Sequence, residues 1–288
     1  MDLNELRLAI DKIDDQLVHL FTQRMEVSAK IADYKKEHGL PIFVPSREAE
    51  KLRDVTQKAG PEMEVYASVL YSMLFELSRG YQSKRNATRT ALYEQIFTAI
   101  ENTPKLMPKD AFIACSADTD AQMNLVCQKL FGTHTMMPFK NLDGILSAVQ
   151  QGMCRFGIVC IDGNGKDLYD AISAHGLYIV RSFRVNVSKQ YICLSKTLEI
   201  YPGADRSSIR MSLVDQPGAL YKVFSRLYTL GINVLGLESR PIAADNFQRM
   251  FYFDLQTSVY SDEFVQLICE LDDLCQDFSY LGSYVEVV

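Results

Sequence analysis

Residues 3–37 read LNELRLAIDKIDDQLVHLFTQRMEVSAKIADYKKE, and this stretch decides the fold of the first part of the chain. Apolar residues recur along it with alternating spacings of three and four, the pattern of one helix face: Leu3, Leu6, Ile10, Ile13, Leu17 and Leu20. Asp2, with Glu5 three positions later, predicts a capping box. Nothing breaks the pattern before Gly39, so we predict one helix of roughly 50 Å. A helix of this length cannot bury its apolar face within a small domain, which indicates a helical partner, a second chain.

Two cations interrupt the apolar face further along the same helix. Arg24 follows Leu20 by four residues, and Lys35 follows Arg24 by eleven, which is three helical turns, so both point the same way. Each could extend its charged end to solvent or pair with a carboxylate. Because two buried cations in phase need a compensating charge, the pattern favours a site for an anion.

Two more helices are predicted, and they add polar residues of the same kind. Ser46 is a candidate N-cap for the second helix, and a third helix covers about residues 63–82. The resulting set of donors and acceptors suits a small polyanion bearing hydroxyls: Arg24, Lys35, Arg47, Glu48, Ser78 and Gln82. The set holds no nucleophile–base pair and no metal cluster, so it is suited to binding and orienting a molecule. We therefore expect neither a metal nor a cofactor.

Residues 1–85 resemble the all-helical chorismate mutases, in which three-helix chains form an intertwined dimer. The matching residues are Arg7, Arg24, Lys35, Arg47, Glu48, Ser78 and Gln82. The resemblance implies that chorismate is the substrate and that it rearranges to prephenate. It implies that Arg7 of a second chain and Arg24 hold the two carboxylates, while Lys35 and Gln82 donate to the ether oxygen. Glu48 would hold the ring hydroxyl, and Arg47 and Ser78 would complete the polar wall. Val44 departs from the family, because many members carry an aspartate there.

The pattern changes after Ser207 to strand, helix, strand, strand, helix, strand, the βαββαβ order of ferredoxin-like folds. The predicted strands and helices are SSIRMSLV, a helix after Pro217-Gly218, GINVLGLES, QRMFYFDLQT, SDEFVQLICELDDL and SYVEVV. DQPGALYKVF and GINVLGLESRPI are similar to the ACT domains of phenylalanine-regulated prephenate dehydratases. By itself, PGAL is equally consistent with a tight turn before a helix. With both motifs present, the resemblance implies that L-phenylalanine is an effector bound by Gly218, Ala219, Leu220, Glu238, Ser239, Arg240 and Pro241.

The order of these segments resembles the bifunctional chorismate mutase/prephenate dehydratases, with a shortened middle. We predict a multidomain α and α/β protein: a helical mutase domain (1–85), a helical linker (86–104), a single α/β lobe resembling half a prephenate dehydratase (105–203) and an ACT domain (204–288). The family's dehydratase motifs are replaced by CSADTDAQ, by the loop at Cys160 and by SKQY from Ser188. We therefore expect no dehydratase activity. The alternatives are a full bifunctional enzyme and a non-catalytic phenylalanine-sensing subunit.

The stretch from Cys160 to Asp170, CIDGNGKDLYD, could hold calcium, cradle a phosphate or simply turn. It carries Lys166, Asp167 and Ser173 where a calcium loop requires Asp or Asn, Gly and Glu. It also lacks the spacing of a phosphate-binding loop. We predict a turn from strand to helix.

Composition sets the remaining expectations. Hydrophobic residues make up 48% and charged residues 23%, as in soluble globular proteins, and no apolar run is long enough to cross a membrane. All seven cysteines lie beyond residue 110 without a CxxC pair, which favours a reduced, cytoplasmic protein. The formal net charge is −6 and no basic stripe is present, so a nucleic-acid partner is not expected. The expected partners are chorismate, L-phenylalanine and further copies of the chain, at least a dimer.

Overall fold

The structure is a computed structural model, and it describes residues 2–86, 90–118, 121–161, 168–186, 189–242, 245–274 and 277–287. The chain divides into two compact units. The first comprises Met1–Thr88 with Tyr221–Thr229, and the second comprises Arg89–Leu220 with Leu230–Val288.

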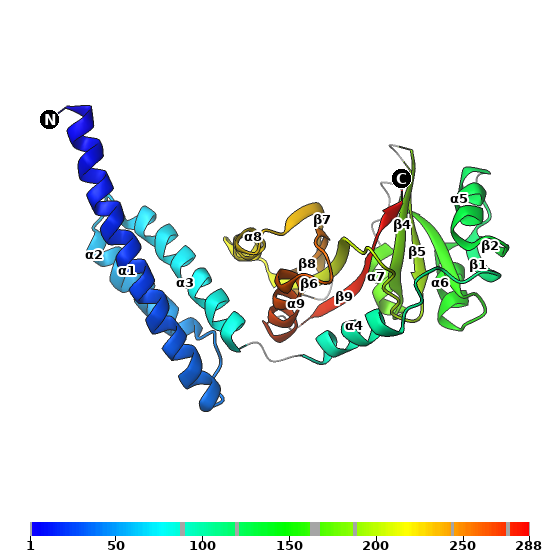
Figure 1. Cartoon of the computed structure of the whole chain (residues 1–288), viewed down its shortest axis with the longest axis horizontal. Helices are drawn as coiled ribbons and strands as arrows, with labels where there is room; N and C mark the ends of the chain where they lie inside the picture. Colours follow the sequence, from blue (N-terminus) through cyan, green and yellow to red (C-terminus); the bar gives the residue numbers. More distant parts are fainter. Residues whose placement is uncertain are drawn as a thin grey trace. The chain divides into compact units, whose positions relative to one another are not determined.

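Three helices make up the N-terminal part: α1 (Leu3–Glu37), α2 (Pro45–Ala59) and α3 (Glu64–Asn86) (Figure 1). The first has the predicted length, and the predicted capping box is present: the Asp2 side chain accepts from the backbone of Glu5, whose own side chain accepts from the backbone of Asp2. Both α1 and α2 pack against α3. This arrangement puts the C-terminal half of α1, the start of α2 and the end of α3 around one space.

The predicted N-cap of α2 is wrong. The helix begins at Pro45 with Val44 as its N-cap residue, and no side chain caps it, so Ser46 lies inside the first turn. Proline explains the difference, because its fixed φ suits the first helical position and it has no N–H to satisfy there.

The second unit begins with α4 (Ala91–Asn102), which occupies the predicted linker, and continues into a six-stranded sheet. The strands are β1 (Ala111–Ser116), β2 (His134–Phe139), β3 (Phe156–Ile161), β4 (Tyr178–Asn186), β5 (Lys189–Ser195) and β10 (Glu286–Val287), in the order β10-β4-β5-β3-β1-β2. Strands β1, β2 and β3 are parallel, and β5 runs antiparallel between β3 and β4.

Helices cover both faces of this sheet. On one face α5 (Ala121–Phe131) contributes Cys127 and Phe131 to a core with Ile113 and Phe156. On the other, α6 (Leu142–Gln150) and α7 (Leu168–Ala174) contribute a second core that includes Leu146 and Ile172. The apolar runs of the strands are therefore buried on both sides, as expected for a largely parallel sheet.

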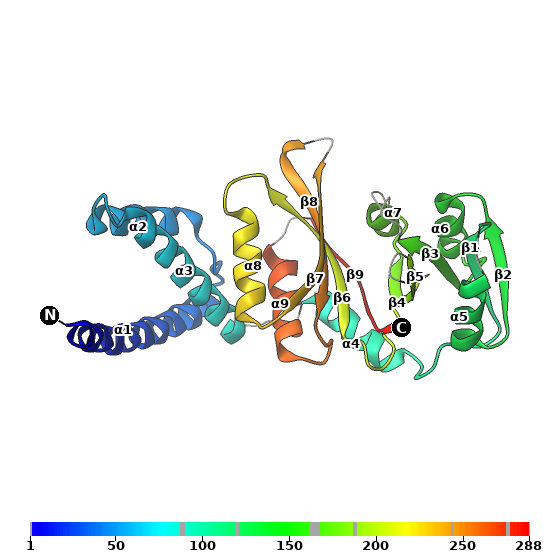
Figure 2. The same cartoon turned by 90° about the horizontal axis from the view of Figure 1, so that it is seen from above.

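A four-stranded antiparallel sheet follows, in the order β7-β8-β6-β9. Its elements are β6 (Arg206–Val214), α8 (Ala219–Thr229), β7 (Asn233–Ile242), β8 (Asp245–Gln256), α9 (Asp262–Leu274) and β9 (Phe278–Tyr284), the predicted βαββαβ order. Figure 2 shows α9 lying along one face of this sheet. The Phe264 ring of α9 meets Tyr280 of β9 edge to face.

The predicted last strand, SYVEVV, is wrong in its placement. The strand in the four-stranded sheet is β9, which begins five residues earlier, at Phe278, and β10 pairs instead with β4 of the six-stranded sheet. Gly282, at φ 135°, permits the crossing, since a Cβ there would lie 2.2 Å from the Ile179 carbonyl of β4. Glu286 anchors the new pairing by accepting from Arg206 at 2.5 Å and Arg184 at 3.3 Å.

The two sheets share a core. Met250, Tyr252 and Leu281 of the C-terminal segment pack with Leu146 and Ile172 of the middle segment, and the Tyr169 and Tyr252 rings stack at 5.6 Å. The middle and C-terminal segments therefore form one packed body. The glycine-rich stretch predicted as a turn lies between β3 and α7, and its residues 162–167 are outside the described part of the chain.

Candidate active site

A pocket of about 620 Å³ opens among the three N-terminal helices. Six of the seven residues predicted for the mutase site line it: Arg24 and Lys35 from α1, Arg47 and Glu48 from α2, and Ser78 and Gln82 from α3. Because each comes from a helix and not from a loop, packing between helices fixes their relative positions. Leu20, Val27, Ile31, Ile42, Val44 and Phe75 form the apolar part of the wall.

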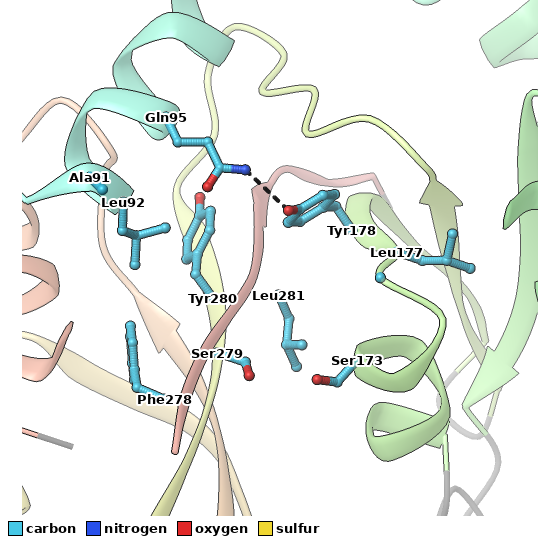
Figure 3. Close-up of a pocket in the computed structure, with 11 residues that line it drawn as sticks. Ala91, Leu92, Gln95, Ser173, Leu177, Tyr178, Phe278, Ser279, Tyr280 and Leu281 are labelled. Carbon is cyan, nitrogen blue, oxygen red and sulfur yellow. Dashed lines mark hydrogen bonds between the residues drawn. The ribbon is translucent and has the colours of Figure 1, made fainter. Parts of the chain in front are cut away.

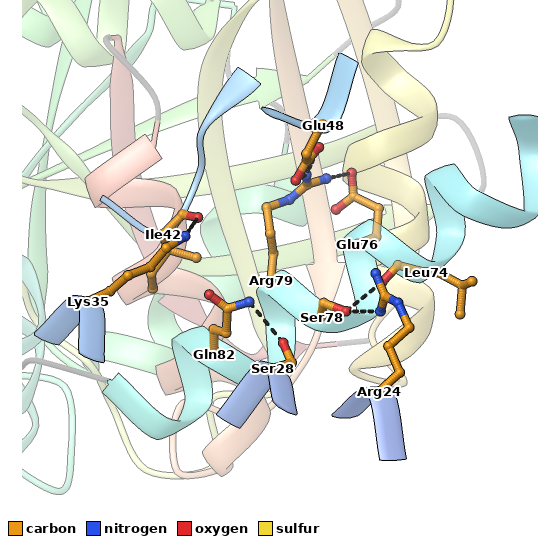
Figure 4. Close-up of polar contacts among 10 residues, drawn as sticks. All are labelled: Arg24, Ser28, Lys35, Ile42, Glu48, Leu74, Glu76, Ser78, Arg79 and Gln82. Carbon is orange, nitrogen blue, oxygen red and sulfur yellow. Dashed lines mark hydrogen bonds and ion pairs between the residues drawn. The ribbon is translucent and has the colours of Figure 1, made fainter. Parts of the chain in front are cut away.

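Arg24 is held by α3 (Figure 4). Its Nη1 donates to the Leu74 carbonyl at 3.0 Å and to the Ser78 hydroxyl, and its guanidinium lies 6.0 Å from the centre of the Phe75 ring. The Ser78 hydroxyl donates to the Leu74 carbonyl at 2.7 Å. Burial lowers the pKa of Arg24, although an arginine keeps its charge at physiological pH. The result is a fixed, partly desolvated cation facing the pocket.

Lys35 stands three turns further along α1. Its Nζ donates to the Ile42 carbonyl at 2.6 Å, in the segment that leads into α2. Burial lowers the pKa of Lys35, and the nearby Glu48 carboxylate opposes this shift. A lysine with a lowered pKa remains a cation at neutral pH but loses its proton more readily in alkali.

Gln82 is buried, and its Nε2 donates to the Ser28 hydroxyl of α1 at 2.9 Å. Its Oε1 has no hydrogen-bond partner among the residues that the structure describes. The Ser28 hydroxyl can either accept or donate a hydrogen bond. The Gln82 amide can therefore also adopt the flipped orientation, in which Ser28 donates to Oε1 and the NH₂ group points into the pocket. Ser28 was missed by the sequence analysis, and its signal was a position four residues after Arg24 on the same helix face.

Glu48 and Arg79 form an ion pair between α2 and α3. Arg79 Nη1 donates to both Glu48 oxygens, and Nη2 donates to Glu76 Oε1. The sequence analysis missed Arg79, whose local signal was an acid–base pair with Glu76 three residues earlier. Arg47 lies at the rim, where it donates to Glu50 at 2.9 Å with both side chains largely exposed.

The charge of the lining favours an anion. Arg24, Lys35, Arg47, Lys51 and Arg79 are cations, and Glu48 is the one acid among the described lining residues. An apolar wall strengthens the interaction of these charges with a bound anion, because fewer waters screen them. The pocket is thus suited to a small molecule with two negative groups, an apolar body and a hydroxyl for Glu48.

Arg7 is the predicted residue that the pocket does not include. It lies on α1 seventeen residues before Arg24, about 25 Å away along the helix axis, and its side chain is exposed. The apolar face around it is exposed as well, with Leu6 at 46%, Ile10 at 57% and Ile13 at 55%. Such a face on a helix is expected to be covered in the functional protein.

The residues predicted to bind an effector lie on two elements. Gly218, at φ 86°, precedes α8, which Ala219 and Leu220 begin, and Glu238, Ser239, Arg240 and Pro241 lie on β7. Arg249 of β8 connects the two regions, since it donates to the Ser239 hydroxyl at 3.2 Å and lies 3.9 Å from Asp215 in the turn before Gly218. Arg240 pairs with Glu238 at 3.2 Å and with Asp170 of α7 at 3.6 Å.

A second cavity, of about 390 Å³, lies among α4, the start of β4 and β9 (Figure 3). Gln95 donates to the Tyr178 hydroxyl at 3.1 Å on one side, and Ser173 and Ser279 lie on another. Its described lining carries no charged side chain. This cavity therefore lacks the electrostatic character of the helical pocket.

Among the described residues, no cluster of three or more His, Cys, Asp or Glu side chains is placed to hold a metal ion. None of the described helices has the length and apolar character that a membrane span requires.

Comparisons with known proteins point to the same helices. Residues 6–83 match the family model "Chorismate mutase type II". The chain is 21% identical to the bifunctional chorismate mutase/prephenate dehydratase of Aquifex aeolicus over 356 residues, covering 98% of each chain. Since that alignment is longer than the 288 residues of this chain, the relative contains segments that this chain lacks. The T-protein of Haemophilus influenzae is 36% identical over 77 residues, 26% of this chain and 20% of the relative.

Solved structures resemble this chain at the level of fold. A prephenate dehydratase from Arthrobacter aurescens in complex with L-Phe covers 60% of this chain and 89% of its own, with a TM-score of 0.53 and 15% identity. The quorum-quenching acylase GqqA covers 60% and 94%, with a TM-score of 0.53 and 23% identity. Over about 60% of its length, the chain thus has a fold that proteins of different activity share.

Proposed function

We propose that the pocket among α1, α2 and α3 is the active site of a chorismate mutase. The match of residues 6–83 to the type II chorismate mutase family and the bifunctional Aquifex relative support this activity, which makes the chain an isomerase. The observation that carries the proposal is the convergence of five cations and one acid on a pocket with an apolar wall. Chorismate is a dicarboxylate with an apolar ring and a hydroxyl, so its groups match those of the lining.

The reaction converts chorismate to prephenate within one molecule. One carbon–oxygen bond breaks as one carbon–carbon bond forms, so neither water nor a second reactant enters. We assign Arg24 to a carboxylate of the substrate, because its guanidinium is fixed by Leu74 and Ser78. Arg47, at the rim, and Ser78, beside Arg24, complete the polar wall. Holding the flexible substrate in its compact conformer supplies much of the acceleration.

Lys35 and the Gln82 amide donate to the ether oxygen as it gains negative charge. Each such donor contributes a few kcal/mol, roughly 3–4, when it is fixed in advance in a site with little water. Glu48 accepts from the ring hydroxyl. Gln82 carries no ionisable proton, so this donor does not require an acidic medium.

A second copy of the chain completes the site by supplying Arg7. Arg7 lies too far along α1 to reach the pocket of its own chain, and the exposed apolar face of α1 gives the second copy a surface to pack on. Exposure of this many aliphatic side chains on one helix favours an obligate dimer.

The C-terminal sheet is proposed to be an ACT domain that binds L-phenylalanine. The first turn of α8 can offer backbone N–H groups to a carboxylate, and Glu238 offers a charge for the ammonium. The contacts of Arg249 with Ser239 and Asp215 support a single site built from both motifs. The binding of L-Phe by the Arthrobacter aurescens protein supports the ligand.

We propose that the middle segment has no prephenate dehydratase activity. A dehydratase cleft needs two lobes, and here β4 and β5 are antiparallel neighbours separated by only two residues in the sequence, so no second lobe is inserted between them. The longer Aquifex relative supports a deletion. The boundaries at residues 85, 104 and 203 are proposed to mark segments that correspond to separate domains in the family. They do not separate independent cores, because the middle and C-terminal segments share one core.

One set of assays tests these statements together. Purified protein should consume chorismate and release prephenate, and phenylpyruvate should form from prephenate no faster than in a blank without protein. Titrating L-phenylalanine into the chorismate assay should change the rate, while calorimetry measures binding directly. Binding without a change in rate would keep the effector site and remove the regulation. Absence of mutase turnover would overturn the proposed active site.

A further inference from the structure

Arg79 lies in the mutase pocket, and the roles assigned above leave it unused. Its side chain is only 14% exposed. Nη1 donates to both oxygens of Glu48, and Nη2 donates to Glu76 (Figure 4). The guanidinium also lies 4.9 Å from the centre of the Phe43 ring. Two acids and an aromatic face thus fix this cation from three directions.

A simpler explanation is that Arg79 only ties α2 to α3. The chain offers a comparison, because Arg85 on the same helix ties α3 to Asp33 of α1 at 2.7 and 3.0 Å. In that pair both side chains are about half exposed, and neither residue lines the pocket. Arg79 and Glu48 both line it, and Glu48 is 26% exposed. The Arg79 pair is therefore placed where its loss would affect a bound molecule.

The charges around Glu48 explain what Arg79 does for it. Glu48 is the one acid among the described lining residues. Val44, which also lines the pocket near the start of α2, has no polar side-chain atom and cannot share the role of Glu48. A carboxylate has about four lone-pair sites, and a single nitrogen held between its two oxygens leaves the outer sites open. A hydroxyl can therefore donate to Glu48 while Arg79 stays bound. The ion pair also fixes the rotamer of Glu48 at the start of α2.

Arg79 is poorly placed to bind the substrate carboxylates itself. Its second edge is occupied by Glu76, which is 11% exposed and whose pKa is raised by burial against the opposing effect of Arg79. Moving the guanidinium towards a ligand would leave two partly buried glutamates without their common cation, which is costly. The contacts of Arg79 therefore favour an indirect role.

We propose that Arg79 is a positioning residue, which holds the Glu48 carboxylate directed at the ring hydroxyl of the substrate. The proposal rests on the proposed function of the pocket and deepens it. Specificity follows from the same arrangement, because a substrate that donates a hydroxyl to Glu48 gains from the fixed carboxylate, whereas an analogue without that hydroxyl does not.

A double-mutant cycle tests this role. kcat and KM for chorismate are measured for the wild type, Arg79→Met, Glu48→Gln and the double variant, with Arg79→Lys as the conservative change and Arg85→Met as the matched control. We expect Arg79→Met to lower kcat/KM about tenfold to a hundredfold, the loss typical of a hydrogen bond to a charged group. Arg79→Lys should recover part of this loss, and Arg85→Met should stay within about twofold of the wild type.

The cycle separates an indirect role from a direct one. If Arg79 acts through Glu48, kcat/KM of the double variant should lie within about threefold of kcat/KM of the less active single variant. A double variant whose loss equals the product of the two single losses would overturn the proposal, as would equal rates for Arg79→Met and Arg85→Met. Circular dichroism checks the folding of each variant, and if Arg79→Met does not fold, Arg79→Lys takes its place in the cycle. A wild type without turnover would contradict the proposed function itself, so the two failures are distinct.

Discussion

Ile10, Ile13 and Leu17 on α1 are each more than half exposed, whereas Ile145, Leu146 and Val149 on α6 are at most 3% exposed. Both helices carry apolar residues at helical spacing, but those of α6 are covered within the chain, whereas those in the N-terminal half of α1 are exposed. The α/β part has a core covered on both faces, and the helical part leaves an apolar face exposed, which we propose a second copy covers. The region proposed to carry the chemistry is thus the one whose apolar face is exposed in a single chain.

The largest change in rate is expected when a cation of the pocket is removed. Arg24→Ala should lower mutase turnover by about a thousandfold or more, because it leaves a substrate carboxylate without its partner in a poorly hydrated site. The control is Arg155→Ala, which removes an arginine of the α/β part that pairs with Glu199 at 2.9 Å. Initial rates on chorismate, with helicity checked by circular dichroism, provide the measurement. Normal activity in Arg24→Ala would reject the site.

The next test addresses the exposed face of α1. Ile13→Glu should dissociate the dimer and lower the mutase rate by about a hundredfold, because it places a charge on an apolar interface and separates Arg7 from the site it completes. Asp15→Lys is the control, since position 15 lies about 200° around the helix from position 13. Sedimentation gives the oligomeric state beside the rate. An active monomer would remove the role proposed for the second copy.

The pH dependence of the mutase rate tests the role of Lys35 in the pocket. Lys35 carries its stabilising positive charge only when protonated, and burial lowers its pKa from the ordinary 10.5. The mutase rate should therefore be constant near neutrality and fall about tenfold per pH unit once the pH exceeds this lowered pKa. Lys35→Arg should move the fall to higher pH, because an arginine keeps its proton there. An identical alkaline fall in both proteins would assign it to another group.

The smallest expected effect compares the same substitution in both regions. Leu146→Ala in the buried core should lower the free energy of unfolding by about 2–5 kcal/mol at any protein concentration. Leu17→Ala should have an effect that grows with the fraction of dimer, because the leucine is 53% exposed in one chain. Urea unfolding at two protein concentrations distinguishes the two cases. A concentration-independent loss at Leu17 would mean that it packs within its own chain.

The sequence predicted what depends on local periodicity. The 35 residues of α1, its capping box and six residues of the pocket all follow from spacing on a helix or from matching motifs. Arg79 was missed because its partner Glu48 lies 31 residues away on another helix. The pairing of β10 with β4 was missed because two residues are too few to show a strand period.

Strand β10 has a consequence for the order in which the protein is made. Val287 pairs with Phe183 of β4 across more than a hundred residues, so a ribosome must produce the entire four-stranded sheet before the six-stranded one can close. Until then, β4 presents an open edge on a partly assembled nascent chain, a state that is vulnerable to association with other chains. Synthesis therefore completes the two sheets nearly at the same moment.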